Sequence, residues 1–337
     1  MESTHISRKI HITIYLFSIL LFLASLGLLG YEFNQIERIR EELDVTDKNL
    51  EASGIKIEEL GKKLASMPSV KTEKVESAQE NPEDMIPEHT MPEYITQLKG
   101  ELQEKIENLQ NDGSQWSVYF CDLKGGKDFT LNNNKMQAAS LIKLFIMGCV
   151  YEDYEMMTLK DTKEQIDEWL KLMITISDND AANQLVYVLG DGDEAKGRDK
   201  VNRFAEEHGY TATHMGRLLL ASNDLDDNYT SVADCGKFLW NCYENKLSYS
   251  NDMQELLKQQ SRRQKIPAGI PDDVIVGNKT GELQDVHNDV AIVYIEESPY
   301  LLCVMSQELK NSDEAINQIA ELSGIVYSSV KDVDVKN

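Results

Sequence analysis

The sequence predicts an α/β domain whose sheet is interrupted by an inserted helical block. Patterns with the period of β-strands occur near both ends of the globular part, and helical patterns fill the region between them, from Ala138 to about Gln260. The composition of the first 91 residues changes three times along the chain, and none of these segments resembles the globular part. We therefore expect one globular domain, residues 92–337, behind a segmented N-terminal region.

Residues 10–30 predict a transmembrane helix. This stretch is almost entirely apolar, and Arg8 and Lys9 stand directly before it. About twenty residues in a helix are enough to cross a hydrocarbon core of ~30 Å, and the positive charges favour an inside position for residues 1–9. The apolar stretch is long for a signal peptide, and no small-x-small cleavage site follows it. We expect an uncleaved anchor with the rest of the chain outside.

Residues 31–67 predict a helical stalk, and residues 68–91 a disordered linker. Apolar residues recur at intervals of seven, at Ile36, Leu43, Leu50, Ile57 and Leu64. This spacing suits a short parallel coiled coil, and hence a homodimer. Thr46, Ser53 and two glycines weaken the seam, so a single amphipathic stalk is the alternative. The linker is rich in Pro, Glu, Ser and Thr, a composition that cannot bury a core.

The elements of the domain follow from their hydrophobic spacing. A helix is expected over Glu93–Gln110, and a strand pair joined by a Gly125–Gly126 turn follows it. After the helical block, strand patterns return and a final helix closes the chain. The expected strands are 116–122, 128–131, 274–276, 290–295 and 300–306, and the final helix is 312–331.

Charge and cysteine usage exclude several kinds of function. The net charge of −24 leaves no basic patch for a nucleic acid, so we expect no nucleic-acid partner. The five cysteines are expected to be buried free thiols, which for a chain outside the membrane suits a bacterial envelope. The six histidines show no spacing of metal ligands, so neither a metal nor a cofactor is predicted.

Ser140 and Lys143 are the first candidate catalytic residues. They stand one helical turn apart in an otherwise apolar stretch, Ala138–Met147. A lysine among Ile142, Leu144 and Phe145 is expensive to desolvate, so we expect its pKa to be lowered. A neutral lysine beside a serine hydroxyl is a nucleophile with its base. Ser-x-x-Lys alone is weak, since the chain contains it twice more, at Ser53 and Ser328.

Two further motifs accompany this pair. Ser177-Asp178-Asn179 lies in a polar turn between two helical patterns, where Ser177 offers a hydroxyl and Asn179 an amide. The same turn is also an ordinary N-cap. Lys279-Thr280-Gly281 follows the strand at 274–276, where Lys279 supplies a fixed cation, Thr280 a donor, and Gly281 room for a ligand to approach the backbone. A plain glycine turn is the alternative.

The three motifs occur in an order and context that resemble the class A β-lactamases and penicillin-binding proteins. The resemblance covers roughly residues 92–331 and includes Ser177-Asp178-Asn179-Asp180-Ala181-Ala182-Asn183. It implies a β-lactamase-like fold, an antiparallel sheet flanked by helices with an all-helical subdomain. It also implies that Ser140 forms an acyl-enzyme with Lys143 as its base, and that Ser177 and Lys279 pass a proton to the leaving nitrogen.

The same resemblance implies how a substrate is held. Asn179 would bind a side-chain amide and Thr280 a carboxylate. The backbone N–H groups of Ser140 and Glu282 would form an oxyanion hole beside Gly281. Glu282 itself is a departure, because it places a carboxylate beside a site expected to bind carboxylates.

A second departure concerns deacylation. Class A β-lactamases carry a loop glutamate that activates the deacylating water, and residues 209–243 of this chain contain no glutamate. Arg217 and residues 228–231 resemble the two ends of that loop, but the sequence between them differs. Asp224, Asp226 and Asp227 lie in this part and do not match the expected Glu-x-x-x-Asn spacing.

We therefore expect a single-pass protein of the bacterial cell membrane with its catalytic domain outside. Its substrate would be a β-lactam or a D-alanyl peptidoglycan peptide, turned over slowly. A penicillin-binding D,D-peptidase is the nearest alternative. The others are a non-catalytic cell-wall sensor or scaffold and a hydrolase of an unrelated ester or amide.

Overall fold

The computed structural model describes residues 91–158 and 162–334. The chain divides into two compact units, residues 1–85 and residues 86–337, and everything described belongs to the second. The predicted cytoplasmic tail, transmembrane helix and stalk, and the linker as far as residue 90, lie outside the described residues. Within the described ranges, no helix is both long enough and apolar enough to cross a membrane.

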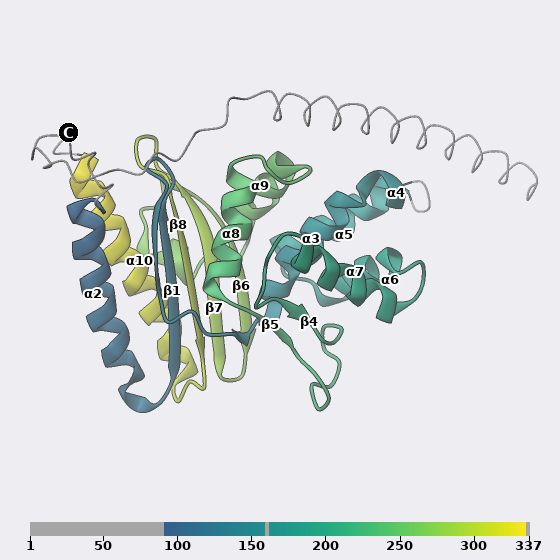
Figure 1. Ribbon diagram of the computed structural model, residues 1–337, viewed down its shortest axis with the longest axis horizontal. Coiled ribbons are helices and arrows are strands. Elements are labelled where there is room, and N and C mark those ends of the chain that lie inside the picture. Colours follow the sequence, from purple (N-terminus) through teal and green to yellow (C-terminus); the bar gives the residue numbers. More distant parts are fainter. Residues whose placement is uncertain (1–90, 159–161, 335–337) are drawn as a thin grey trace, which may run out of the picture. The chain divides into compact units, whose positions relative to one another are not determined.

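A five-stranded antiparallel sheet forms the middle of the second unit (Figure 1). Its order is β2-β1-β8-β7-β6, so the first two strands of the chain join the last three in one sheet. The strands are β1 Gln115–Asp122, β2 Lys127–Leu131, β6 Ile275–Leu283, β7 Val286–Tyr294 and β8 Tyr300–Gln307. β7 and β8 are buried along nearly their whole length, because helices cover both faces of the sheet.

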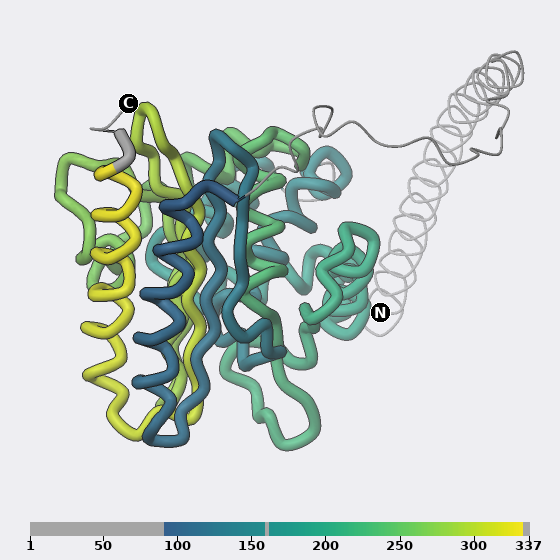
Figure 2. The backbone as a smooth tube through the Cα atoms, turned by 60° about the vertical axis from the view of Figure 1, so that its left-hand side comes forward, coloured from purple at the N-terminus to yellow at the C-terminus, as the bar shows by residue number. Residues whose placement is uncertain are grey.

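The two terminal helices cover one face of the sheet. α2 (Glu93–Leu109) and α10 (Ser312–Asp334) lie side by side in both views (Figures 1 and 2). The apolar residues of α2 recur at helical spacing and are buried, for example Ile95 and Leu98. They pack with strand residues such as Trp116 into one core cluster. Both predicted terminal helices are present.

The inserted block lies on the opposite side of the sheet (Figure 1). Its described helices are α3 Ile142–Glu152, α4 Tyr154–Thr158, α5 Lys163–Thr175, α6 Asn179–Leu189, α7 Glu194–Glu207, α8 Val232–Tyr243 and α9 Ser250–Lys258. α3 is the central helix of the block, and every residue from Ile142 to Tyr151 is buried. Its sequence is therefore apolar on all sides, as a fully enclosed helix requires.

The block also contains a small sheet, so the expectation of an all-helical insertion was incomplete. Three short strands, β3 Met136–Gln137, β4 His214–Met215 and β5 Asn228–Thr230, pair in the order β3-β5-β4. Strands of two or three residues are too short to show an alternating pattern in the sequence. Their pairing brings the chain before Ser140 beside the segment that ends at Thr230.

One strand is longer than predicted, and the thiols are as predicted. The strand predicted over residues 274–276 continues as β6 to Leu283, so Lys279, Thr280 and Gly281 lie within a strand and not in a turn after it. All five cysteines are buried free thiols, as predicted.

Candidate active site

Ser140 lies on a short turn that leads into the buried helix α3. A 3₁₀ turn, Ala139–Leu141, passes directly into α3 at Ile142. Ala139 has φ of 47°, a left-handed conformation that a non-glycine residue keeps only when its surroundings enforce it. On one side of this residue, the N–H of Ala138 donates to the carbonyl of Asn228 at 2.8 Å. The Ser140 hydroxyl is therefore carried by a rigid turn.

Lys143 gathers the predicted site residues around a single nitrogen. Its side chain is fully buried, and Nζ lies 3.2 Å from Oγ of Ser140 and 3.3 Å from Oγ of Ser177. Nζ also donates to the backbone oxygen of Ser177 at 2.6 Å and to Oδ1 of Asn179 at 2.7 Å. Residues from two sequence motifs, 34 to 39 positions apart, thus meet at one amine.

Burial makes Lys143 suitable as a base. Desolvation lowers its pKa to about 7, with Asp178 opposing this shift and Arg262 adding to it. Near neutral pH much of the amine is therefore uncharged. A neutral amine 3.2 Å from a serine hydroxyl can accept the hydroxyl proton.

Ser177 is held in a strained turn between two helices. It separates α5 from α6 and has φ of 62°, again left-handed. Asp178, the next residue, caps α6 by accepting from the N–H of Ala181 at 2.7 Å. The predicted N-cap reading is thus correct for Asp178, while Ser177 turns both its carbonyl and its hydroxyl toward Lys143.

Lys279 approaches the same hydroxyl from the sheet. It lies on β6, the last strand in the sheet order, and its Nζ donates to Oγ of Ser177 at 2.8 Å and to the carbonyl of Thr280 at 2.8 Å. Burial, followed by the charges of Lys143 and Arg262, holds the pKa of Lys279 well below its ordinary value. Ser177 therefore lies between two buried lysines, a geometry suited to moving a proton.

Gly281 is required by close packing against the Ser140 turn. A Cβ atom at this position would lie 2.7 Å from the carbonyl oxygen of Ala138. On the neighbouring strand, Nδ2 of Asn288 donates to the carbonyls of Gln137 at 3.0 Å and Ala138 at 3.3 Å. The space that the sequence suggested for a ligand is thus occupied by the chain just before Ser140. Contacts with β6 and β7 therefore fix the position of the Ser140 turn relative to the sheet.

We expect Gly281→Ala to lower the acylation rate of Ser140 by a factor of about 10 to 10². The added methyl group must displace the Ala138 carbonyl, and a misplacement of up to 1 Å near a reacting atom costs rates of this order. Labelling of Ser140 by a fluorescent penicillin measures the effect. Gly100→Ala is the matched control, since a Cβ on Gly100 meets nothing within 4 Å. An unchanged rate in Gly281→Ala would show that the turn tolerates the shift.

Glu282 has partners that the sequence did not reveal. One carboxylate oxygen lies 2.8 Å from Nη1 of Arg262, and the other lies 3.0 Å from Nζ of Lys265. These cations keep the pKa of Glu282 below its ordinary value although desolvation opposes them. The carboxylate that looked out of place in the sequence is therefore an ion-paired anion at neutral pH.

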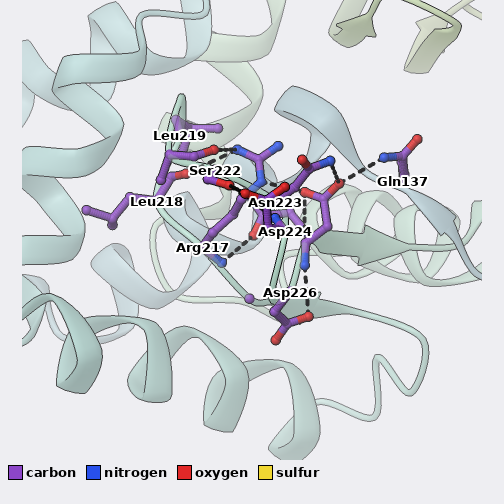
Figure 3. Close-up of polar contacts among 12 residues, drawn as sticks. Gln137, Arg217, Leu218, Leu219, Ser222, Asn223, Asp224 and Asp226 are labelled. Carbon is purple, nitrogen blue, oxygen red and sulfur yellow. Dashed lines mark hydrogen bonds and ion pairs between the residues drawn. The ribbon is translucent and has the colours of Figure 1, made fainter.

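The loop between Arg217 and Asp227 closes on itself through its ends (Figure 3). Nε of Arg217 donates to Asp227 at 2.7 Å, in an ion pair that is largely buried. Gln137, next to the Ser140 turn, donates to the other oxygen of Asp227 at 2.8 Å, and the N–H of Asn228 donates to the first at 2.8 Å. The loop ends that the sequence indicated thus meet, with Asp227 as the residue that joins them.

The same loop is fastened to the helix that carries Asn179. Oδ1 of Asn183 accepts from the N–H of Leu219 at 2.9 Å, and Nδ2 of Asn183 donates to the carbonyl of Leu219 at 3.1 Å. Asn183 is one helical turn beyond Asn179 on α6 and so shares its face. Leu219 is accordingly the loop residue whose backbone these bonds fasten to α6, one helical turn from Asn179, and its side chain is buried.

A separate hollow of about 230 Å³ lies between α3 and α7. It is lined by Cys149, Phe204 and the ion pair of Lys200 with Asp153, whose charged atoms are 2.7 Å apart, among others. None of the predicted site residues lines it. We place the candidate site around Lys143 and Ser140, because the predicted side chains converge on Nζ of Lys143.

Comparisons with known proteins agree with this fold. A family model described as the beta-lactamase enzyme family matches residues 99–167 and 155–330. No curated protein matches the sequence. Among solved structures, PBP-A is similar with a TM-score of 0.62 at 21% identity, over 71% of this chain and 97% of that chain. A leucine-to-glutamate variant of PBP-A, solved as an acyl-enzyme with penicillin G, gives a TM-score of 0.60 at 20% identity, over 71% of this chain and 97% of that one. A β-lactamase from Sphaerobacter thermophilus gives 0.59 at 19% identity, over 68% of this chain and 96% of that one.

Proposed function

Because the chain belongs to the beta-lactamase enzyme family, we propose that it is a serine hydrolase that acylates Ser140 with a β-lactam or a D-alanyl peptide. The observation that carries the proposal is the distance of 3.2 Å between Oγ of Ser140 and Nζ of a buried Lys143 whose pKa is about 7. A serine next to an uncharged amine is an activated nucleophile. The family match alone gives the fold and the class of enzyme.

The contacts support one course for the proposed acylation step. The amine of Lys143 takes the proton of Ser140 as Oγ attacks the carbonyl carbon, and the C–N bond of the substrate then breaks. Ser177 gives its proton to the departing nitrogen and is reprotonated through Lys143 or Lys279, which lie 3.3 and 2.8 Å from its hydroxyl. The backbone N–H groups of Ser140 and Glu282 supply the oxyanion donors, each worth about 10²–10³ in rate.

The substrate contacts come from the remaining predicted residues. Lys143 holds the amide oxygen of Asn179 at 2.7 Å, which fixes the orientation of that amide and directs its NH₂ group away from the amine. The NH₂ group then donates to an amide oxygen of the substrate side chain. Thr280 lies beside Lys279 on β6 and donates to the substrate group next to the scissile bond, which is a carboxylate in penicillins and D-alanyl peptides.

Deacylation is expected to be slow. Residues 209–243 contain no glutamate, and Leu219 occupies the loop position that Asn183 fastens to α6. A long-lived acyl-enzyme gives the behaviour of a penicillin-binding protein, and a slow release gives that of a weak β-lactamase. The long-lived acyl-enzyme supports the D,D-peptidase alternative only if a peptide is the natural acyl donor. For a pure sensor or scaffold, the arrangement of two buried lysines around Ser177 would serve no purpose.

We further propose that the domain acts outside the cell membrane. The support is the apolar stretch of residues 10–30 with Arg8 and Lys9 before it, and the stalk pattern of residues 31–67, which a homodimer would use. The domain would then meet its substrate at the distance from the membrane that the linker allows.

The test is covalent labelling of the full-length chain. We expect a fluorescent penicillin to label the wild type stably and Ser140→Ala not at all, while a chromogenic cephalosporin is hydrolysed slowly or not at all. Ser328→Ala is the matched control, because Ser328 belongs to a second Ser-x-x-Lys pattern on the exposed surface of α10. Rapid loss of the label with many turnovers would identify a β-lactamase with another deacylating group. Absence of Ser140-dependent label would refute the proposal.

A further inference from the structure

A cluster of charges lies at β6, the strand that carries Thr280, where two cations from the segment after α9 meet a carboxylate of the strand. The acylation chemistry does not use it. We define this charge cluster as Glu282, Arg262 and Lys265. Along a strand, residues two apart point to the same side, so Glu282 projects on the same side as Thr280. Any group of a substrate that reaches Thr280 therefore approaches the carboxylate of Glu282.

Arg262 belongs to the mouth of the same site. The segment before it is fastened beside Ser177, because the N–H of Ser261 donates to the carbonyl of Thr175 at 2.9 Å and Nε2 of Gln260 donates to that of Ile174 at 2.6 Å. The Arg262 side chain is 44% exposed, and its charge acts on both Lys143 and Lys279. It is thus a solvent-accessible cation close enough for its charge to lower the pKa of both buried lysines.

Both cations of the cluster are already engaged. Each oxygen of Glu282 has its own partner, at 2.8 Å for Arg262 and 3.0 Å for Lys265. Lys265 is buried and donates in addition to the carbonyl of Asn288 at 3.1 Å, so it cannot turn toward the cleft. An incoming carboxylate would have to share Arg262 with Glu282, and two carboxylates in one partly buried site repel each other.

We propose that Glu282 determines substrate specificity by selecting against a free carboxylate, and that the preferred substrates carry a carboxamide at that position. A carboxamide has no charge to repel Glu282, and its N–H groups can donate to the Glu282 carboxylate. The proposal rests on the proposed function, since it names the class of substrate that Ser140 acylates. The sequence alone raised the question of what this carboxylate does, and the ion pairs with Arg262 and Lys265 give the answer.

The test compares two matched thioesters of an N-acyl-D-alanine. One has thiolactate as its leaving group, and the other has thiolactamide, so they differ only in carboxylate against carboxamide. The full-length chain is mixed with each, and the initial rate of thiol release gives the acylation rate constant. We define the selectivity as the constant for the carboxamide divided by that for the carboxylate.

We expect a selectivity above about ten in the wild type. Glu282→Gln should lower it at least tenfold, because the repulsion disappears and Arg262 becomes available to the carboxylate. Arg262→Gln should raise it at least threefold, because the remaining cation shields Glu282 less well. Glu321→Gln makes the same change of charge at an exposed position of α10, where Glu321 pairs with Lys105 and not with the charge cluster, and should leave the selectivity unchanged.

Two results would overturn the proposal: a wild type that prefers the carboxylate, or a selectivity in Glu282→Gln within twofold of the wild type. If neither thioester acylates the wild type, the proposed function fails, and the same pair is then compared by calorimetric binding to Ser140→Ala. Suppose that Ser140→Ala binds the carboxamide more tightly than the carboxylate, and that adding Glu282→Gln to this variant removes the difference. This result would still support selection by the charge cluster. An equal affinity of the two compounds would refute it.

Discussion

Lys143→Met is expected to reduce acylation of Ser140 by a factor of about 10³. A positioned general base contributes about 10²–10⁴ in rate, and Lys143 is the amine closest to the Ser140 hydroxyl among the contacts of the described residues. Methionine has a similar length and suits the apolar surroundings of α3. The rate of labelling by a fluorescent penicillin measures the effect, and Lys171→Met, at an exposed position of α5, is the control.

The pH dependence provides an independent check of this role. The base must be uncharged, so the acylation rate of the wild type should rise with pH and level off above about pH 8, because the pKa of Lys143 is about 7. A lysine with an ordinary pKa near 10.4 would instead make the rate rise up to about pH 10. The rise centred near pH 7 should be absent in Lys143→Met. A variant that folds, as judged by thermal unfolding, and keeps the full acylation rate would rule out Lys143 as the base.

Leu219→Glu is expected to shorten the lifetime of the acyl-enzyme by a factor of about 10². Asn183 fastens the backbone of residue 219 to α6, one helical turn from Asn179, which itself contacts Lys143. We therefore expect a carboxylate at this position to activate the water that attacks the acylated serine. The site of Leu219 is buried, and burial raises the pKa of a carboxyl group toward the range useful for a base. Loss of the fluorescent label with time measures the lifetime.

Leu220→Glu is the matched control for this prediction. It adds the same charge to the next residue of the loop, but Leu220 is 78% exposed and has no clamp from Asn183. Burial of a new carboxylate at 219 costs stability, about 1–3 kcal/mol for a polar group in protein mutants. An unchanged label lifetime in a folded Leu219→Glu that still acylates normally would mean that this loop does not position the deacylating water.

The sequence predicted the parts of the site that depend on local order. Ser140 and Lys143 are one helical turn apart, so their contact follows from the helix alone. Ser177 and Lys279 were connected to them only by the resemblance in motif order. The structure supplies the distances between these side chains. It shows that residues of the first two motifs meet at Nζ of Lys143 and not at the hydroxyl of Ser140.

The rest of the site depends on contacts between segments that no local pattern links. Arg262 and Lys265 reach Glu282 from a segment about 20 residues away, and nothing in their own surroundings marks them as partners. Asn183 was visible as the last residue of the family-like phrase, but its partner Leu219 was not, because the loop shares no frame with the expected glutamate motif. The sequence did not predict the short strands β3, β4 and β5, because two or three residues are too few to show the alternation of apolar and polar residues that marks a strand.

The burial of all five cysteines has a practical chemical consequence. Cys121, Cys235, Cys242 and Cys303 are at most 2% exposed. Cys149 lines the hollow between α3 and α7 but is only 5% exposed, and burial raises the pKa of its thiol to about 12, so little reactive thiolate is present in the folded domain. The thiol released from a thioester can therefore be titrated in the presence of the protein without a background from its own sulfur atoms. The same reagent becomes a reporter of integrity, because a preparation that reacts before substrate is added contains unfolded chains. Because all five cysteines are free, a reductant has no disulfide to break in this protein. The assay and its reductant-treated control therefore start from the same native structure.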